Sequence, residues 1–121
     1  MTAVISLSEQ AGFVVDRLRQ LADLPVGWDG EGGPALKATA KAAAINLVNR
    51  GFFDRVPRPH MGPVMGGGLQ FEWQIGSRGL EIEVLPNGSI EFLAVQGDAQ
   101  GQGQIMDDSM LDTLSAWLMQ C

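Results

Sequence analysis

Residues 69–94, LQFEWQIGSRGLEIEVLPNGSIEFLA, decide the fold of this 121-residue chain. Apolar and polar residues alternate through the segment in three runs, and turn-forming residues separate the runs. A two-residue period is typical of a strand with one buried face. The segment therefore predicts a three-stranded antiparallel meander over residues 69–75, 80–84 and 90–94.

The first turn of the meander determines how the first two strands pair. If residues 76–79 form the turn, Ile75 pairs with Leu80 and Trp73 with Ile82, so that apolar residues face each other throughout. If the pairing slipped by one residue, all the apolar side chains of one strand would face the solvent. We therefore expect this register to be strongly specified.

The second turn favours a three-residue loop. A two-residue Asn87-Gly88 turn would place Val84 opposite a glutamate and mix the two faces of the sheet. With residues 86–88 as the loop, proline is early in a type I turn and Gly88 takes the left-handed position of a bulge. Val84 then faces Ile90.

These two registers together predict a row of glutamates on the polar face. Glu72 is expected beside Glu83, and Glu83 beside Glu91, although like charges opposite each other in a sheet are unfavourable. The polar face carries no lysine or arginine, and its apolar members are Leu85, Leu93 and Val95. Two interpretations stay open: a solvated sheet face, or a contact surface for a basic partner.

The rest of the chain predicts three helices and two connections. The apolar spacing and the stop signals indicate helices over residues 7–23 and 35–50, and a last helix that begins at Asp107 or Asp108. Residues 54–68 are an extended connection that leaves room for a short edge strand at Val64 and Met65. Residues 97–104, GDAQGQGQ, are expected to be a mobile glycine and glutamine loop. The prediction is one α+β domain over residues 1–121, in the order α-α-β-β-β-α, with the helices on the apolar face of the sheet.

Charge is distributed unevenly along the chain. The net charge is −6, and residues 59–121 contain a single basic side chain, Arg78, among eight acidic ones. A negative field of this kind repels nucleic acid and anionic membranes and favours a basic protein surface. The single cysteine, Cys121, excludes an intramolecular disulfide, and the sequence shows neither a signal peptide nor a membrane span. The expected location is therefore the cytoplasm.

A second candidate contact is the glycine-rich loop that contains Trp28, Asp29 and Glu31. An exposed tryptophan flanked by acids is typical of an interface anchor, whereas a buried one would pack the loop onto the core. The single histidine, His60, has no nucleophile at a recognisable spacing, and no zinc or calcium motif is present. The sequence therefore predicts neither a metal nor a cofactor. A small enzyme that uses Asp29, Glu31 and His60 stays open as an alternative.

Three segments together resemble a known group. DLPVGWDGEGGP, GGGLQFEW and LEIEVLPNGSIEFL are similar to segments of small, functionally uncharacterised bacterial and mobile-element proteins, which share a GWDG-type loop, a GG-x-x-F-E-W strand and an LEIEV strand. The resemblance implies a prokaryotic or phage origin. Small acidic proteins of that origin often act as inhibitors or antitoxins by binding, and the resemblance supplies no catalytic residue.

These observations predict a non-enzymatic inhibitor, of the anti-CRISPR or another anti-defence type, in a bacterial host. It would block a basic nucleic-acid-binding surface of a protein partner without contacting nucleic acid itself. The alternative from the same evidence is an antitoxin that neutralises a cognate toxin by direct binding, and the oligomeric state is left open. The expected partner-binding residues are Glu72, Glu81, Glu83, Glu91, Trp28, Asp29 and Glu31.

Overall fold

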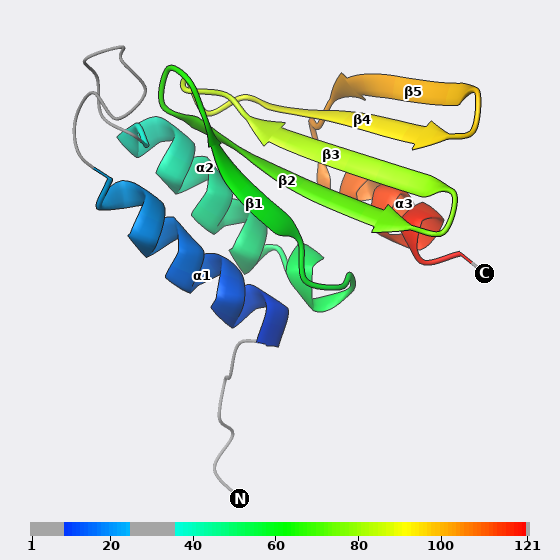
Figure 1. Cartoon of the computed structure of the whole chain (residues 1–121), viewed down its shortest axis with the longest axis horizontal. Coiled ribbons are helices and arrows are strands. Elements are labelled where there is room, and N and C mark those ends of the chain that lie inside the picture. Colours follow the sequence, from blue (N-terminus) through cyan, green and yellow to red (C-terminus); the bar gives the residue numbers. More distant parts are fainter. Residues whose placement is uncertain (1–8, 25–35, 121) are drawn as a thin grey trace, which may run out of the picture.

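The computed structural model describes residues 9–24 and 36–120. Within these ranges the chain forms three α-helices, one 3-10 helix and a five-stranded antiparallel sheet (Figure 1). The strands lie in the sheet in their sequence order, so the sheet is a meander from β1 to β5. The elements are α1 (Glu9–Ala22), α2 (Ala38–Asn49), η1 (Phe52–Asp54), β1 (His60–Val64), β2 (Gly68–Ile75), β3 (Arg78–Val84), β4 (Ile90–Gln96), β5 (Ala99–Gln104) and α3 (Asp108–Leu118).

The α+β class is confirmed, but the three-stranded sheet is wrong because two further strands flank the predicted ones. The segment expected to be a mobile loop over residues 97–104 instead forms β5. Gly97, at φ 57°, and Asp98 make a two-residue turn, and Gln96 then pairs with Ala99. At the other edge, β1 begins at His60, earlier than the short strand expected at Val64 and Met65.

The predicted register of the first hairpin is wrong by two residues. Ile75 pairs with Arg78, and Trp73 with Leu80, because the turn contains only Gly76 and Ser77. Gly76 has a φ of 57°, which suits the first central position of a type II′ turn, and such turns match the twist of the flanking strands. Trp73 and Phe71 still face apolar residues, since a shift of two residues keeps every side chain on its own face.

The three-residue turn of the second hairpin is confirmed. Gly88 has a φ of 92°, and its N–H donates to the carbonyl of Leu85 over 2.8 Å. The N–H of Leu85 in turn donates to the carbonyl of Ser89 over 2.8 Å, which closes the bulged loop. Val84 therefore lies opposite Ile90, as the sequence predicts.

Capping residues mark the start of α3 and the end of α2. The side chain of Asp107 accepts a hydrogen bond from the N–H of Met110 over 3.0 Å and so caps the start of α3. After α2, Gly51 takes the left-handed conformation with a φ of 78°. Helix α2 begins at Ala38, three residues later than expected, and the first residues of both predicted helices, 7–8 and 35, lie outside the described residues.

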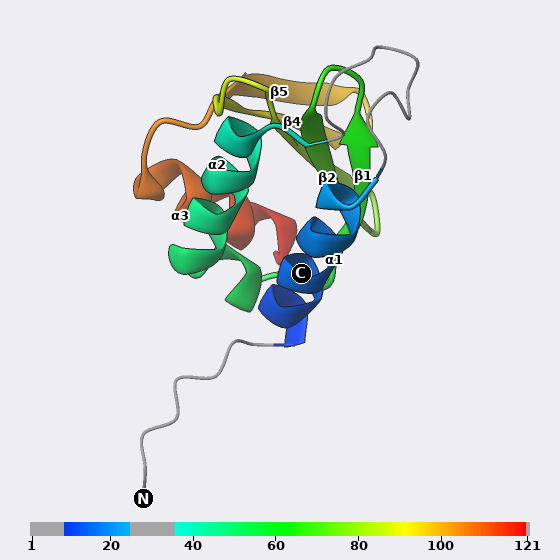
Figure 2. The ribbon, with the colours of Figure 1, turned by 90° about the vertical axis from the view of Figure 1, so that its left-hand side faces the viewer.

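The hydrophobic core lies between the sheet and the helices, which gather on one face of the sheet (Figure 2). Its centre is aromatic: Phe53 packs against Phe52, Phe71 and Trp73 with ring centroids 5.0–6.2 Å apart. The indole N–H of Trp73 donates to the carbonyl of Pro57 over 2.8 Å, so this polar group is satisfied. The inner face of β2 and β3 thus packs in the core, and the other face of these strands is turned away from the helices.

Among residues 9–24 and 36–120, the helices lack the length and hydrophobicity that a membrane-spanning helix requires.

Candidate protein-binding face

The candidate site is the outer face of the sheet, which we define as the face turned away from the helices. The strand register arranges its side chains in three rows that cross the sheet. The rows are Gly62, Gln70, Glu83, Glu91 and Gln104; then His60, Glu72, Glu81, Leu93 and Gln102; then Gln74, Gly79, Val95 and Gln100.

Four glutamates occupy the centre of this face, and we call Glu72, Glu81, Glu83 and Glu91 the glutamate cluster. Glu72 lies opposite Glu81, and Glu83 lies opposite Glu91. The predicted pairing of Glu83 with Glu91 is confirmed, whereas the predicted pairing of Glu72 with Glu83 is wrong because of the two-residue shift. Glu83 has Gln70 as its partner on β2. The shift therefore brings Glu81 into the cluster and makes it two pairs instead of one row.

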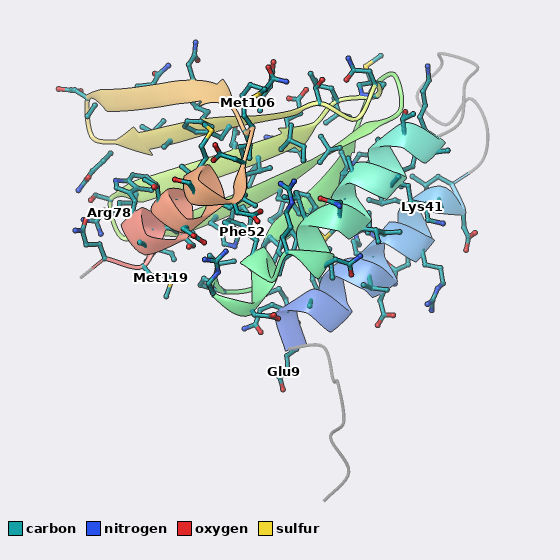
Figure 3. All side chains as sticks on the ribbon, turned by 180° about the vertical axis from the view of Figure 1, so that it is seen from behind. Glu9, Lys41, Phe52, Arg78, Met106 and Met119 are labelled. Carbon is teal, nitrogen blue, oxygen red and sulfur yellow. The ribbon has the colours of Figure 1, made fainter. Side chains whose placement is uncertain are left out.

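No lysine or arginine projects from the outer face within the described strands. Arg78, the basic residue of β3, lies on the inner face, where its guanidinium donates to the backbone carbonyl of Gln120. The same group lies over the ring of Trp117, 5.9 Å from the ring centroid, beside the end of α3 (Figure 3). The sheet therefore separates this cation from the glutamate cluster, which has no lysine or arginine beside it on the described part of the outer face.

The outer face is hollowed on both sides of Leu93. One hollow of about 390 Å³ extends from Glu81, Glu83 and Glu91 to the last strand, β5. A second of about 310 Å³ extends toward His60 and Glu72, and Glu81 and Leu93 line both. The face therefore carries two neighbouring hollows lined by glutamates, with the apolar side chain of Leu93 between them, which is the composition of a contact surface.

Of the other predicted site residues, His60 lies on this face and lines its second hollow. Trp28, Asp29 and Glu31 lie outside the described residues, so their predicted contact role stays a prediction. His60 lies on β1 directly beside Glu72, at the edge of the sheet. Residues 9–24 and 36–120 contain no group of three or more histidine, cysteine, aspartate or glutamate side chains placed to hold a metal ion.

The sequence prediction missed three residues of the face, namely Gln100, Gln102 and Gln104. They alternate with Ala99, Gly101 and Gly103, so the strand has a two-residue period without any large apolar residue. Glutamine alternating with glycine was the available signal for this strand.

The paired glutamates give a prediction for stability. Replacing Glu91 by lysine changes the repulsion across β3 and β4 into attraction to Glu83, and we expect the free energy of unfolding to rise by about 0.5–1 kcal/mol. Urea unfolding in low salt measures this change. In about 1 M salt, where the Debye length is about 3 Å, most of the gain should vanish. A variant that is less stable than the wild type in low salt would show that the pair is not repulsive.

Compared with known proteins, the chain matches no family model, no curated protein and no solved structure. The likeness of its GWDG and LEIEV segments to the mobile-element group therefore stays a prediction.

Proposed function

We propose that this protein is a non-enzymatic inhibitor that uses its outer sheet face to bind a basic surface of a protein partner. The observation that carries the proposal is the glutamate cluster, four carboxylates on one hollowed face with no lysine or arginine among them. A protein retains such repulsion at a cost in stability, and a basic partner would remove that cost upon binding.

The proposed partner is a nucleic-acid-handling protein in a bacterial host. Surfaces that bind nucleic acid are rich in lysine and arginine, because these residues neutralise phosphates. An acidic face presents the same charge as the phosphate backbone and competes for the same surface. We propose that the protein is encoded by a phage or mobile element and that it acts in the cytoplasm as an anti-CRISPR-type or other anti-defence protein.

The antitoxin alternative receives less support from the described residues. Its contact would come from the helix faces and from Trp28, which lies outside the described residues. The large apolar side chains that are exposed in residues 9–24 and 36–120 are dispersed. Met106 precedes α3 and Met119 follows it, so the whole helix separates them (Figure 3). Ile45 lies on α2 and Met65 in the turn before β2.

A binding test distinguishes specific binding by the outer face from attraction by the net charge of the protein. We expect the wild type to bind a fluorescent nona-arginine peptide and to displace it from a DNA oligonucleotide, with affinity that falls as salt rises. Neutralising the glutamate cluster with Glu72→Gln, Glu81→Gln, Glu83→Gln and Glu91→Gln should weaken binding by at least about tenfold, since it removes four interactions that are each modest.

The matched control neutralises four acids on the helical side, with Glu9→Gln, Asp16→Asn, Asp23→Asn and Asp54→Asn. Both quadruple variants remove four negative charges, so their net charge is the same. We expect the control to retain most of the affinity. Equal losses in the two variants would show that the peptide follows net charge and would contradict a specific role for the outer face.

A further inference from the structure

The last strand, β5, is an open edge of the sheet. Within the described residues it pairs only with β4, and every residue of the strand is exposed. The other edge strand, β1, is one residue shorter and contains Pro63. Natural proteins protect free edges with prolines, charges or bulges, and β5 has no proline and no charged residue. Its edge is therefore available to another strand.

The hydrogen-bond pattern shows which backbone groups are free. The N–H of Ile105 donates to the carbonyl of Ile90 over 2.8 Å, which makes these two residues a hydrogen-bonded pair. Such pairs alternate along an antiparallel ladder, so Gly103 and Gly101 also bond to β4. The backbone N–H and C=O groups of the alternate residues therefore point toward the open edge. These residues are Gln100, Gln102 and Gln104.

The two faces of β5 differ in what they would offer to an added strand. On the outer face, Gln104 lies beside Glu91, and the hollow of about 390 Å³ extends from Glu91 to β5. On the inner face, a side-chain carbon added at Gly101 would meet nothing within 4 Å. The half-buried ring of Phe92 covers Gly103, with ring carbon Cε1 3.3 Å from the position of an added carbon. An incoming strand would thus meet acids on one face and open space beside an aromatic ring on the other.

We propose that β5 binds an extended segment of a basic protein as an additional strand of the sheet. Arginine or lysine at every second position would lie on the outer face, and small apolar residues would lie between them. The inference rests on the proposed function, because the glutamate cluster selects the basic residues. A residue opposite Gln104 is two strand spacings from Glu91, about 10 Å between Cα atoms, which the extended side chains of arginine and glutamate span together.

Charge complementarity favours this occupant over a second copy of the chain. Pairing β5 with β5 of another molecule would join two acidic faces into one, and like-charge contacts across an interface are unfavourable. The net charge of −6 on each molecule also disfavours the association of two copies.

Two labelled peptides of equal composition test the proposal in low salt. One alternates arginine and valine over eight residues, and the other places the four arginines before the four valines. We expect the wild type to bind the alternating peptide about tenfold more tightly, because only this peptide can pair as a strand and place all its arginines on one face. The alternating peptide should also slow amide hydrogen exchange at Gln100, Gln102 and Gln104.

A proline variant of the edge isolates the backbone contribution. Gln102→Pro removes an N–H that points to the open edge, so it leaves the hydrogen bonds between β4 and β5 intact. We expect it to abolish the preference, so that the alternating and block peptides bind with similar affinity. Gln102→Ala, which keeps the N–H and loses the side chain, should retain the preference. The exchange measurement on the wild type tests the same point without a variant.

The outcomes separate the edge from the acidic face. Equal binding of both peptides without amide protection would overturn the edge proposal, and the proposed function would survive if neutralising the glutamate cluster weakened both. Binding that is unaffected by neutralising the cluster would overturn the proposed function. Absence of binding to either peptide would overturn both. A dimer that light scattering detects and Gln102→Pro dissociates would show that β5 takes a second copy, which would also overturn the peptide proposal.

Discussion

Replacing Phe53 by alanine is expected to lower the free energy of unfolding by about 3–5 kcal/mol, the usual cost of removing a large aromatic side chain from a core. Phe53 is fully buried, and its ring contacts Phe52, Phe71 and Trp73. It therefore joins η1 to the inner face of β2. Since small domains are stable by only about 5–15 kcal/mol, the variant should be partly unfolded at moderate temperature. Urea unfolding followed by tryptophan fluorescence measures the change.

The same substitution at Phe13 is the matched control. Phe13 lies half-buried on α1, at the margin of the core, with the guanidinium of Arg58 4.5 Å from its ring centroid. Its loss should cost about 1–2 kcal/mol, because folding removes less apolar surface from water at this position than at Phe53. Equal costs at the two positions would contradict the central place of Phe53 in the core.

Replacing Gly68 by alanine is expected to cost about 2–3 kcal/mol, near the upper end for an overpacked site. A side-chain carbon at Gly68 would lie 2.5 Å from the carbonyl oxygen of Val84 and 3.3 Å from Cδ of Pro86. Both neighbours belong to the backbone or to a rigid ring, so the strain falls on the pairing of β2 with β3. Thermal unfolding should show a marked fall in Tm.

Gly62→Ala is the control for this prediction. Gly62 is also a strand glycine, but an added carbon there would meet nothing within 4 Å, and its φ is not positive. Alanine should be neutral at this position or stabilise by about 0.4–1 kcal/mol, because it restricts the unfolded chain. A neutral result at both positions would mean that β2 and β3 do not approach as closely as the structure shows.

The sequence predicted the elements that bury an apolar face. The runs that became β2, β3 and β4 alternate large apolar residues with polar ones, and the inward residues of α3 recur at helical spacing. Strand β5 was mistaken for a loop because glycine and glutamine bury nothing and therefore leave no hydrophobic period. Its pairing is instead fixed by a two-residue turn and by the ring of Phe92 over Gly103.

The register of the first hairpin was mistaken for a different reason. A shift of two residues leaves the apolar pattern unchanged, so only the turn could decide between the two pairings. The second turn was predictable because proline and glycine each have one suitable position in a bulged loop. For the candidate site this means that the sequence predicted the acidic face and the pairing of Glu83 with Glu91, but not the pairing of Glu72, which faces Glu81 in place of Glu83.

The position of Arg78 behind the sheet has an electrical consequence for the whole molecule. All eight lysines and arginines belong to the helices, lie beside them in sequence or, like Arg58 and Arg78, contact helix side chains. The glutamate cluster lies on the opposite side of the sheet. Acids on and beside the helices, among them Glu9, Asp16 and Asp54, offset most of these cations. The helical side is therefore close to neutral while the outer face is negative, which polarises the molecule across the sheet. The field of a basic partner would rotate it during diffusion, so that the acidic face leads before any contact forms.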